Sequence, residues 1–288
     1  MIKYYRLFFL VMISCPAFAR DWTIYISNEI CADYTWVIDE EQTRDAVAEL
    51  IRAHLDLMTA TDHEPWELQN RYTCTITNEA LFFLAKYPER EAELVRRIRE
   101  GRFQLSPFLC NTDWGFPGVE GFLRSLYPAK RLAMKWNVPL EHAVHSELPS
   151  FPWGAAPLLA GSGIRWCAKP FYNYDAHFEK LTNPPLFEYE GPDSSRLRVV
   201  LDPWTCQNFS YAQGAGILKR VWHANNPTTV EGSWLPHFNS LENYPLDIIL
   251  AQGTHGDIAL DSRQEAQIVH DGIQKYNRNP QRPAKLAH

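Results

Sequence analysis

The stretch HAVHSELPSFPWGAAPLLAGSGIRW, residues 142–166, contains the pattern of one strand–helix–strand unit. Residues 142–147 predict a strand, and residues 155–160 predict a short helix that ends at the two glycines following it. A second strand is predicted over residues 164–170. Two strands joined through a helix usually lie parallel, so this unit predicts a parallel sheet covered by helices.

The same alternation of strand and helix extends in both directions from this unit. Before it, the sequence predicts strands at 22–27, 72–76 and 102–108, and helices that begin at Asp39, Thr77, Pro88 and Val119. After it, the sequence predicts a hairpin over 186–201, a strand at 247–252, a helix at 263–276 and a final strand in the tail, with residues 202–245 irregular. This order predicts a single parallel barrel or a doubly wound sheet.

Composition excludes several classes of protein. The chain has 288 residues, 45% of them apolar and 22% charged, which is ordinary for a globular protein with its own core. Its net charge of −6, without a block of positive charge, argues against binding to nucleic acid or to an anionic membrane. The aromatic content of 13% is high and suits flat surfaces that stack against ligands.

Residues 1–19 predict a secretory signal peptide. Lys3 and Arg6 precede a short apolar run, and Ala17-Phe18-Ala19 fits the small-x-small rule for cleavage. A lipid anchor at Cys15 is the alternative. We therefore expect a secreted or periplasmic protein without a membrane span, in which residues 20–288 form one domain.

Polar and metal-ligating side chains gather where the predicted strands end. In a parallel barrel these ends share one rim, where active sites are built from the loops that follow the strands. The side chains concerned are those of Cys31, Asp33, Trp36, Glu79, Asp113, Trp114, His145, Glu147, His255 and Asp257. Together with Trp153 they predict an acidic pocket with aromatic walls.

Two chemistries suit such a pocket. A pair of carboxylates can cleave a glycosidic bond, one attacking the anomeric carbon while the other protonates the leaving oxygen. A metal ion held by carboxylate, histidine or cysteine can instead polarise a hydroxyl or activate water. Composition and spacing leave both possibilities open.

Residues 142–166 resemble the nucleophile segment of glycoside hydrolase family 38, the retaining α-mannosidases. In that family an acidic residue at a strand end is followed by a small turn and a short helix, and Glu147 falls at the nucleophile position. Residues 31–36 are similar to the family's metal motif H-x-D-x-x-W, which they match at Asp33 and Trp36.

Weaker likenesses to the same family follow in the expected order along the chain. Residues 185–204 resemble a hairpin of bacterial members, and residues 244–260 resemble the segment that carries the acid/base, which would be Asp257. The resemblance covers residues 22–288. It implies a distorted (β/α)7 barrel of the glycoside hydrolase/deacetylase type, one zinc ion and α-mannoside or related glycan substrates.

This sequence departs from the family pattern at the implied zinc site. Glu147 stands where the family has aspartate, and Cys31 stands where it has histidine, although a thiolate is an acceptable zinc ligand. The family's downstream zinc-binding histidine lies in a region that this chain lacks, which makes His255 the local candidate. The implied ligands are therefore Cys31, Asp33, Glu147 and His255, and the family's C-terminal domains are expected to be absent.

Two other functions fit parts of the pattern. The chain could be a carbohydrate-binding barrel without catalytic activity, because the zinc ligands are altered. It could also be a metal-dependent polysaccharide deacetylase, although His142 and His145 are three apart on a predicted strand and lack helical ligand spacing. Several site residues have structural readings as well: Glu79 and Asp113 could cap helices, while His145 could orient Glu147 or fill the interior.

Overall fold

The computed structural model describes residues 20–30, 38–145, 148, 150–169, 186–201, 230–241, 244–253 and 262–288. Its strands are β1 Trp22–Ile26, β2 Tyr72–Thr73, β3 Phe103–Gln104, β4 His142–Val144, β5 Trp166–Lys169, β6 Leu186–Glu190, β7 Arg196–Leu201, β8 Ile248–Ala251 and β9 Ala284–Ala287. Its α-helices are α1 Glu40–Ala60, α2 Thr77–Lys86, α3 Glu91–Arg99, α4 Gly118–Trp136, α5 Ala155–Gly161, α7 Leu235–Ser240 and α8 Ser262–Asn277. Short 3₁₀ turns occupy Trp66–Leu68 and Pro88–Arg90, and a π-helical turn occupies Val230–Trp234.

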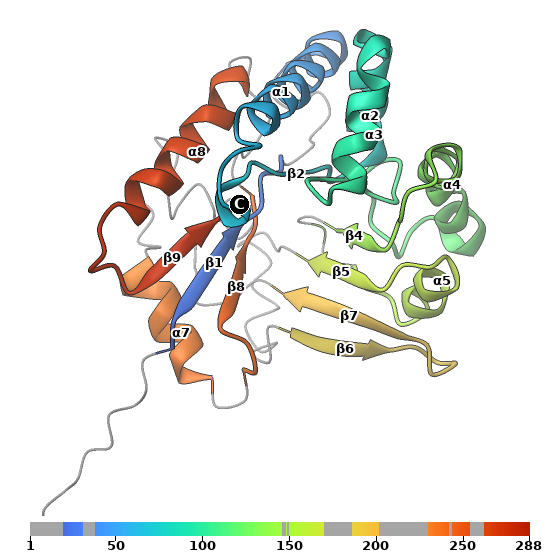
Figure 1. Ribbon diagram of the computed structural model, residues 1–288. Helices are drawn as coiled ribbons and strands as arrows, with labels where there is room; N and C mark the ends of the chain where they lie inside the picture. Colours follow the sequence, from blue (N-terminus) through green and yellow to red (C-terminus); the bar gives the residue numbers. More distant parts are fainter. Residues whose placement is uncertain are drawn as a thin grey trace, which may run out of the picture.

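The described strands form three sheets, and nearly all their pairings are parallel. β1 lies between β8 and β9, with Ile24 opposite Ile249 on one side and Leu286 on the other. β2 pairs with β3, while β4, β5 and β7 are successive parallel strands of the third sheet. β6 runs antiparallel to β7 as the other half of a hairpin. Figure 1 shows helices α8, α1, α2, α3, α4 and α5 along the outer side of these strands.

The predicted α/β alternation is confirmed, including the hairpin and the final strand. The first strand is paired with the last two, as it would be in a sheet that curves back on itself. In the described residues, however, the strands fall into three sheets and do not form one closed cylinder. The structure thus shows a mixed α/β fold with helices outside parallel strands.

Helix α1 begins where the sequence predicts it. The amide of Gln42 donates to Asp39 Oδ1 at 2.8 Å, and the amide of Asp39 donates to Gln42 Oε1 at 3.3 Å. This reciprocal pair satisfies two backbone donors that a helix start otherwise leaves unpaired. The helix then buries Val47, Leu50 and Ile51, because apolar residues at this spacing share one face.

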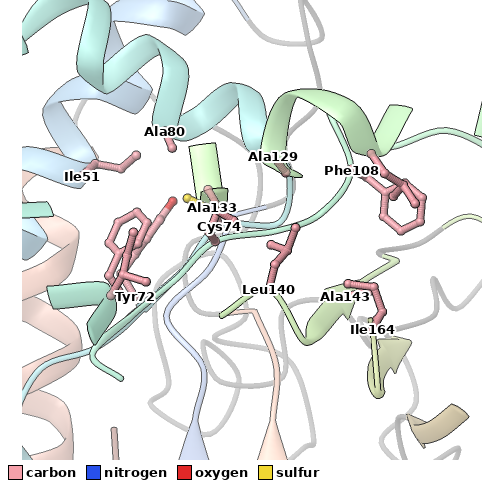
Figure 2. Close-up of a cluster of buried hydrophobic side chains, with 14 of the residues drawn as sticks. Ile51, Tyr72, Cys74, Ala80, Phe108, Ala129, Ala133, Leu140, Ala143 and Ile164 are labelled. Carbon is pink, nitrogen blue, oxygen red and sulfur yellow. The ribbon is translucent and has the colours of Figure 1, made fainter. Parts of the chain in front are cut away.

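Two groups of buried side chains hold the fold together. The larger group joins helices α1 to α5 to the strands β2 to β5 and β7, and the smaller one joins α7 and α8 to β1, β8 and β9. Figure 2 shows part of the larger group, with Tyr72 and Cys74 beside Ile51 of α1 and Ala80 of α2. The helices therefore lie on apolar faces of the sheets, and several polar residues at the strand ends are buried as well.

The strands predicted at 72–76 and 102–108 are much shorter in the structure, as Tyr72–Thr73 and Phe103–Gln104, and one predicted loop is partly helical. Strand β2 ends at Thr73 because the amides of Thr75 and Ile76 donate to the Glu79 side chain, which withdraws them from the sheet. Within the region predicted as irregular, the described residues 230–240 form the π-helical turn and α7. Trp234, the last residue of that turn, is fully buried. The aromatic content of that segment serves packing here.

Arg97 is buried, although a run of arginines such as Arg96, Arg97 and Arg99 in α3 is typical of a solvated helix face. Arg97 is 1% exposed because it shares a helix face with Leu94 and Ile98, which point into the core. Its guanidinium donates to both carboxylate oxygens of Asp62, at 2.6 and 3.0 Å, and Nη1 also donates to Glu100 at 2.8 Å. Asp62 lies next to Arg102, which is also buried and bonded to it. The Asp62 carboxylate is thus the shared counter-ion of two buried guanidinium groups.

Replacing Asp62 by asparagine is expected to lower the free energy of unfolding by about 2 to 3 kcal/mol, because two buried guanidinium groups lose their shared counter-ion. The loss stays below that of a fully buried pair because the Asp62 side chain is 42% exposed. Denaturant unfolding followed by circular dichroism measures the change.

Asp56→Asn is the matched control, because Asp56 pairs with Arg52 and Arg90 and its side chain is 50% exposed. Exposed pairs contribute about 0 to 1 kcal/mol, so this variant should unfold close to the unaltered protein. Equal effects of the two substitutions would show that Asp62 adds no more than a surface charge does.

Candidate functional site

The carboxyl ends of neighbouring strands are joined to one another by backbone hydrogen bonds. The amide of Ser27, just beyond β1, donates to Ala251 O of β8 at 2.8 Å. The amide of Thr73 in β2 donates to Asn28 O at 2.9 Å. These bonds bring the ends of β8, β1 and β2 to one edge of the fold.

The connection continues from β2 to β5. The amide of Cys74, after β2, donates to Gln104 O of β3 at 3.0 Å, and the amide of His145, after β4, donates to Ala168 O of β5 at 3.0 Å. The His145 ring bonds to Thr112 O, in the loop after β3, at 3.1 Å. We call this edge the carboxyl rim, defined by residues 27–30, 74–79, 104–106, 112, 145, 168–169 and 251–253. It joins the strands in the order β8, β1, β2, β3, β4 and β5.

Glu29 is a buried carboxyl group at the rim that was not among the candidates predicted from sequence. It is 3% exposed, it accepts a hydrogen bond from Ser27 Oγ at 3.2 Å, and it bonds to the backbone of Gly253 at the end of β8. Burial raises the pKa of Glu29 to about 8, so the group is mostly protonated at neutral pH. Its position directly after an apolar strand is the one signal in the sequence that could have identified it.

Glu79, a predicted site residue, is fully buried at the start of α2. Its Oε1 accepts hydrogen bonds from the amides of Thr75 and Ile76 at 2.8 and 3.1 Å, and its Oε2 accepts one from the Tyr72 hydroxyl at 2.7 Å. These hydrogen bonds favour the carboxylate and lower the pKa of Glu79, but burial has the larger effect and raises that pKa to about 7. This environment gives Glu79 a structural role in fixing the loop after β2, and direct contact with a substrate stays a prediction.

His145 is held tightly at the end of β4. Its ring stacks on Trp114 with centroids 4.0 Å apart, and Nε2 must donate to Thr112 O because a carbonyl oxygen only accepts. Nδ1 therefore carries a lone pair, and it has no hydrogen-bond partner among the described residues. Burial, assisted by the nearby Lys169 charge, lowers the pKa of His145 to about 2, so the imidazole is neutral.

The predicted aromatic residues are placed apart from one another. Trp114 is 4% exposed and lies between His145 and Phe151 near the rim, so it packs as a core residue. Trp153 is 60% exposed, but its indole N–H donates to Glu190 O at 2.8 Å, beside the turn that precedes β7. That turn is at the amino end of β7, whereas His145 is at the carboxyl end of β4. The structure therefore brings Trp114 and His145 together and leaves Trp153 away from them.

Asp113 closes a turn in the loop after β3. Its Oδ1 accepts a hydrogen bond from the amide of Gly115 at 3.2 Å, and the amide of Phe116 donates to Asp113 O at 3.1 Å. These bonds shape the loop that carries Trp114. A contact between Asp113 and a substrate stays a prediction.

The remaining predicted residues lie outside the described part of the chain. They are the predicted catalytic residues Glu147 and Asp257, the aromatic residue Trp36 and the metal-ligand candidates Cys31, Asp33 and His255. Their described neighbours in sequence, Ile30, His145 and Gly253, all belong to the carboxyl rim. The signal peptide prediction for residues 1–19 also lies outside the described residues.

The donor set predicted for a metal is chemically suited to zinc, since it combines thiolate, carboxylate and imidazole. Within the described ranges, no group of three or more histidine, cysteine, aspartate or glutamate side chains is arranged to hold an ion. The three described cysteines, Cys74, Cys110 and Cys167, are free thiols, and burial raises the pKa of each. A zinc site would therefore depend on the ligands predicted from sequence.

The described helices include none that is long and apolar enough to cross a membrane. No known family model matches the chain, and no curated protein matches it by sequence.

Solved structures do match the fold. An α-mannosidase from Enterococcus faecalis V583 has a TM-score of 0.62 and 16% sequence identity, covering 93% of this chain and 28% of that one. A glycosyl hydrolase family 38 protein from Enterococcus faecalis has a TM-score of 0.52 and 15% identity, covering 93% and 26%. The 4-α-glucanotransferase from Thermococcus litoralis has a TM-score of 0.57 and 9% identity, covering 92% and 39%.

These similarities establish the fold. The chain shares the α/β architecture of glycoside hydrolases and related glycan-processing enzymes, as the sequence analysis predicted at that level. It spans less than two fifths of the length of each of the three proteins.

Proposed function

We propose that this protein is a secreted glycoside hydrolase of the α-mannosidase type that cleaves terminal α-mannosides or a related glycan with retention of configuration. The observation that carries the proposal is the carboxyl rim, along which strands β8, β1, β2, β3, β4 and β5 end in succession. The segments that begin at residues 31, 146 and 254 start from this edge, and they hold the candidate catalytic and metal-binding residues. The fold shared with a solved α-mannosidase supports the same conclusion.

Glu147 is the proposed nucleophile and Asp257 the proposed acid/base. In the first step the Glu147 carboxylate attacks the anomeric carbon, the glycosidic bond breaks, and Asp257 gives its proton to the leaving oxygen. In the second step Asp257 takes a proton from water, whose oxygen displaces Glu147 and releases the sugar. Retaining chemistry of this kind places the two carboxyl groups about 5 to 5.5 Å apart.

Cys31, Asp33, Glu147 and His255 are the proposed zinc ligands. A bound zinc ion supplies Lewis-acid polarisation of sugar hydroxyls. His145, next but one to Glu147 in sequence, is a neutral imidazole because burial lowers its pKa. Trp114 holds that ring in place by stacking.

Hydrolysis of an aryl α-mannoside by the full chain tests the proposal. We expect release of the phenol with an aryl α-glucoside cleaved at least about tenfold more slowly, since a site that hydrogen-bonds one hydroxyl arrangement discriminates against another. Elemental analysis should find one zinc per chain, and a chelator should abolish turnover until zinc is restored.

Binding of mannoside in calorimetry without any release of phenol would instead identify a carbohydrate-binding barrel. Release of acetate from an acetylated polysaccharide, with the mannoside left intact, would identify a deacetylase. Either result would contradict the proposed hydrolase.

A further inference from the structure

We propose that Lys169 is a positioning residue that holds the loop carrying Glu147, and this inference rests on the proposed function. Lys169 is the last residue of β5 and is 1% exposed. Its ammonium group donates to His145 O at 3.3 Å and also to Leu148 O. These two carbonyl oxygens flank Glu147 in sequence, one on each side.

The direction of the Lys169 side chain follows from the strand. Side chains alternate between the two faces of a strand, so Lys169 points to the same face as Cys167, which is fully buried in the apolar core. Burial of an ammonium group among apolar side chains is strongly unfavourable unless oxygens surround it. The carbonyl oxygens of the β4 loop supply such contacts, so the position of the loop and the burial of the charge depend on each other.

Other contacts hold His145, at the start of this loop, in place. The amide of His145 is bonded to Ala168 O, and its ring is fixed by Thr112 and Trp114. Residue 145 is therefore anchored to the sheet by its own groups. Leu148 follows Glu147, and its contact with Lys169 ties the far side of the loop back to β5. Lys169 thus fixes the chain on both sides of the proposed nucleophile.

Lys169→Met tests this role, because methionine keeps most of the side-chain volume and removes the ammonium donors. We expect kcat for the aryl α-mannoside to fall by about a hundredfold with KM changed less than threefold, since a displaced nucleophile slows attack more than binding. We also expect amide hydrogen exchange in residues 145–150 to become at least about tenfold faster.

Two further variants separate positioning from folding. Lys169→Arg keeps donors and charge at this place and should retain clearly more kcat than Lys169→Met. Arg99→Met is the control, because Arg99 also donates to a backbone carbonyl, Trp136 O at 2.6 Å, but at the end of α3. It should leave kcat and the exchange of residues 145–150 unchanged. If Lys169→Met does not fold, Lys169→Gln takes its place, with the same expected losses.

The inference is overturned if Lys169→Met keeps kcat within threefold of the unaltered chain and exchange in residues 145–150 is unchanged. Equal losses in Lys169→Met and Lys169→Arg would also overturn it, by showing that only packing matters. A wild-type chain without mannosidase activity contradicts the proposed function, and the exchange measurement alone then decides whether Lys169 holds the loop.

Discussion

Replacing Glu147 by glutamine is expected to lower kcat for an aryl α-mannoside by at least about a thousandfold. The amide has almost the size of the carboxylate but is a very poor nucleophile, so the covalent glycosyl-enzyme cannot form at a useful rate. Binding depends on groups that the substitution leaves in place, so KM should change far less than kcat. Initial rates of phenol release across a range of substrate concentrations give both constants.

Glu141→Gln is the matched control for this substitution. Glu141 stands just before β4 and therefore at the opposite end of the same strand, where its carboxylate lies 3.7 Å from Arg165. Loss of this exposed pair should leave kcat within about twofold, because such pairs contribute little. If Glu147→Gln behaves like Glu141→Gln, the nucleophile has been assigned to the wrong residue.

Stability is expected to be highest between about pH 4.5 and 6.5 and to fall by about 3 kcal/mol by pH 9. Glu29 and Glu79 have raised pKa values of about 8 and about 7, so the folded chain keeps two protons that the unfolded chain releases near pH 4.5. Stability from such groups is fully present below the unfolded pKa and is lost as pH rises through the folded pKa. Each pKa unit is worth about 1.4 kcal/mol.

Two buried histidines have the opposite effect on stability, and they make it nearly constant between about pH 4.5 and 6.5. Burial lowers the pKa of His145 to about 2 and that of His288 well below its usual range, so the unfolded chain takes up protons below about pH 6.5 that the folded chain does not. Between pH 4.5 and 6.5 the two histidines offset the two carboxyl groups. Below pH 4.5 only the histidine effect continues, and stability should fall steeply as pH decreases.

Denaturant unfolding at pH 5.5, 7 and 9, with a chelator in every buffer, measures this profile. The double variant Glu29→Gln/Glu79→Gln should lose the decline between pH 6.5 and 9, because neither amide titrates. Glu89→Gln, at an exposed position, should keep the decline seen in the unaltered chain. An unchanged alkaline decline in the double variant would show that other groups cause it.

Sequence reasoning succeeded where a few neighbouring residues determine the structure. The start of α1 depends on Asp39 and Gln42, which meet within one helical turn, and the hairpin of β6 and β7 depends on the turn between them. The alternation of apolar segments with helices also predicted the parallel strands, since strands that are joined through helices usually lie parallel in one sheet.

Sequence reasoning failed where burial depends on distant parts of the chain. In the sequence, Arg97 looks like a surface charge, because its partner Asp62 follows a different helix, α1. Glu29 was not predicted, because its partner Gly253 lies far along the sequence. Trp153 was grouped with Trp114 from composition, although the loop between His145 and α5 carries it toward the other end of the sheet. Composition gives no distances, so it could not separate these tryptophans.

The pairing of β1 with β8 and β9 has a consequence for how the polypeptide acquires its structure. Strand β1 cannot pair with either partner until nearly all of the described chain has been made (Figure 1). Helices α1 to α3 form hydrogen bonds between residues close in sequence and can form early, while the sheet of β8, β1 and β9 must wait for a very long loop to close. Folding should therefore be limited by arrival of residues 248–287, and until then β1 is an open edge that other chains could occupy.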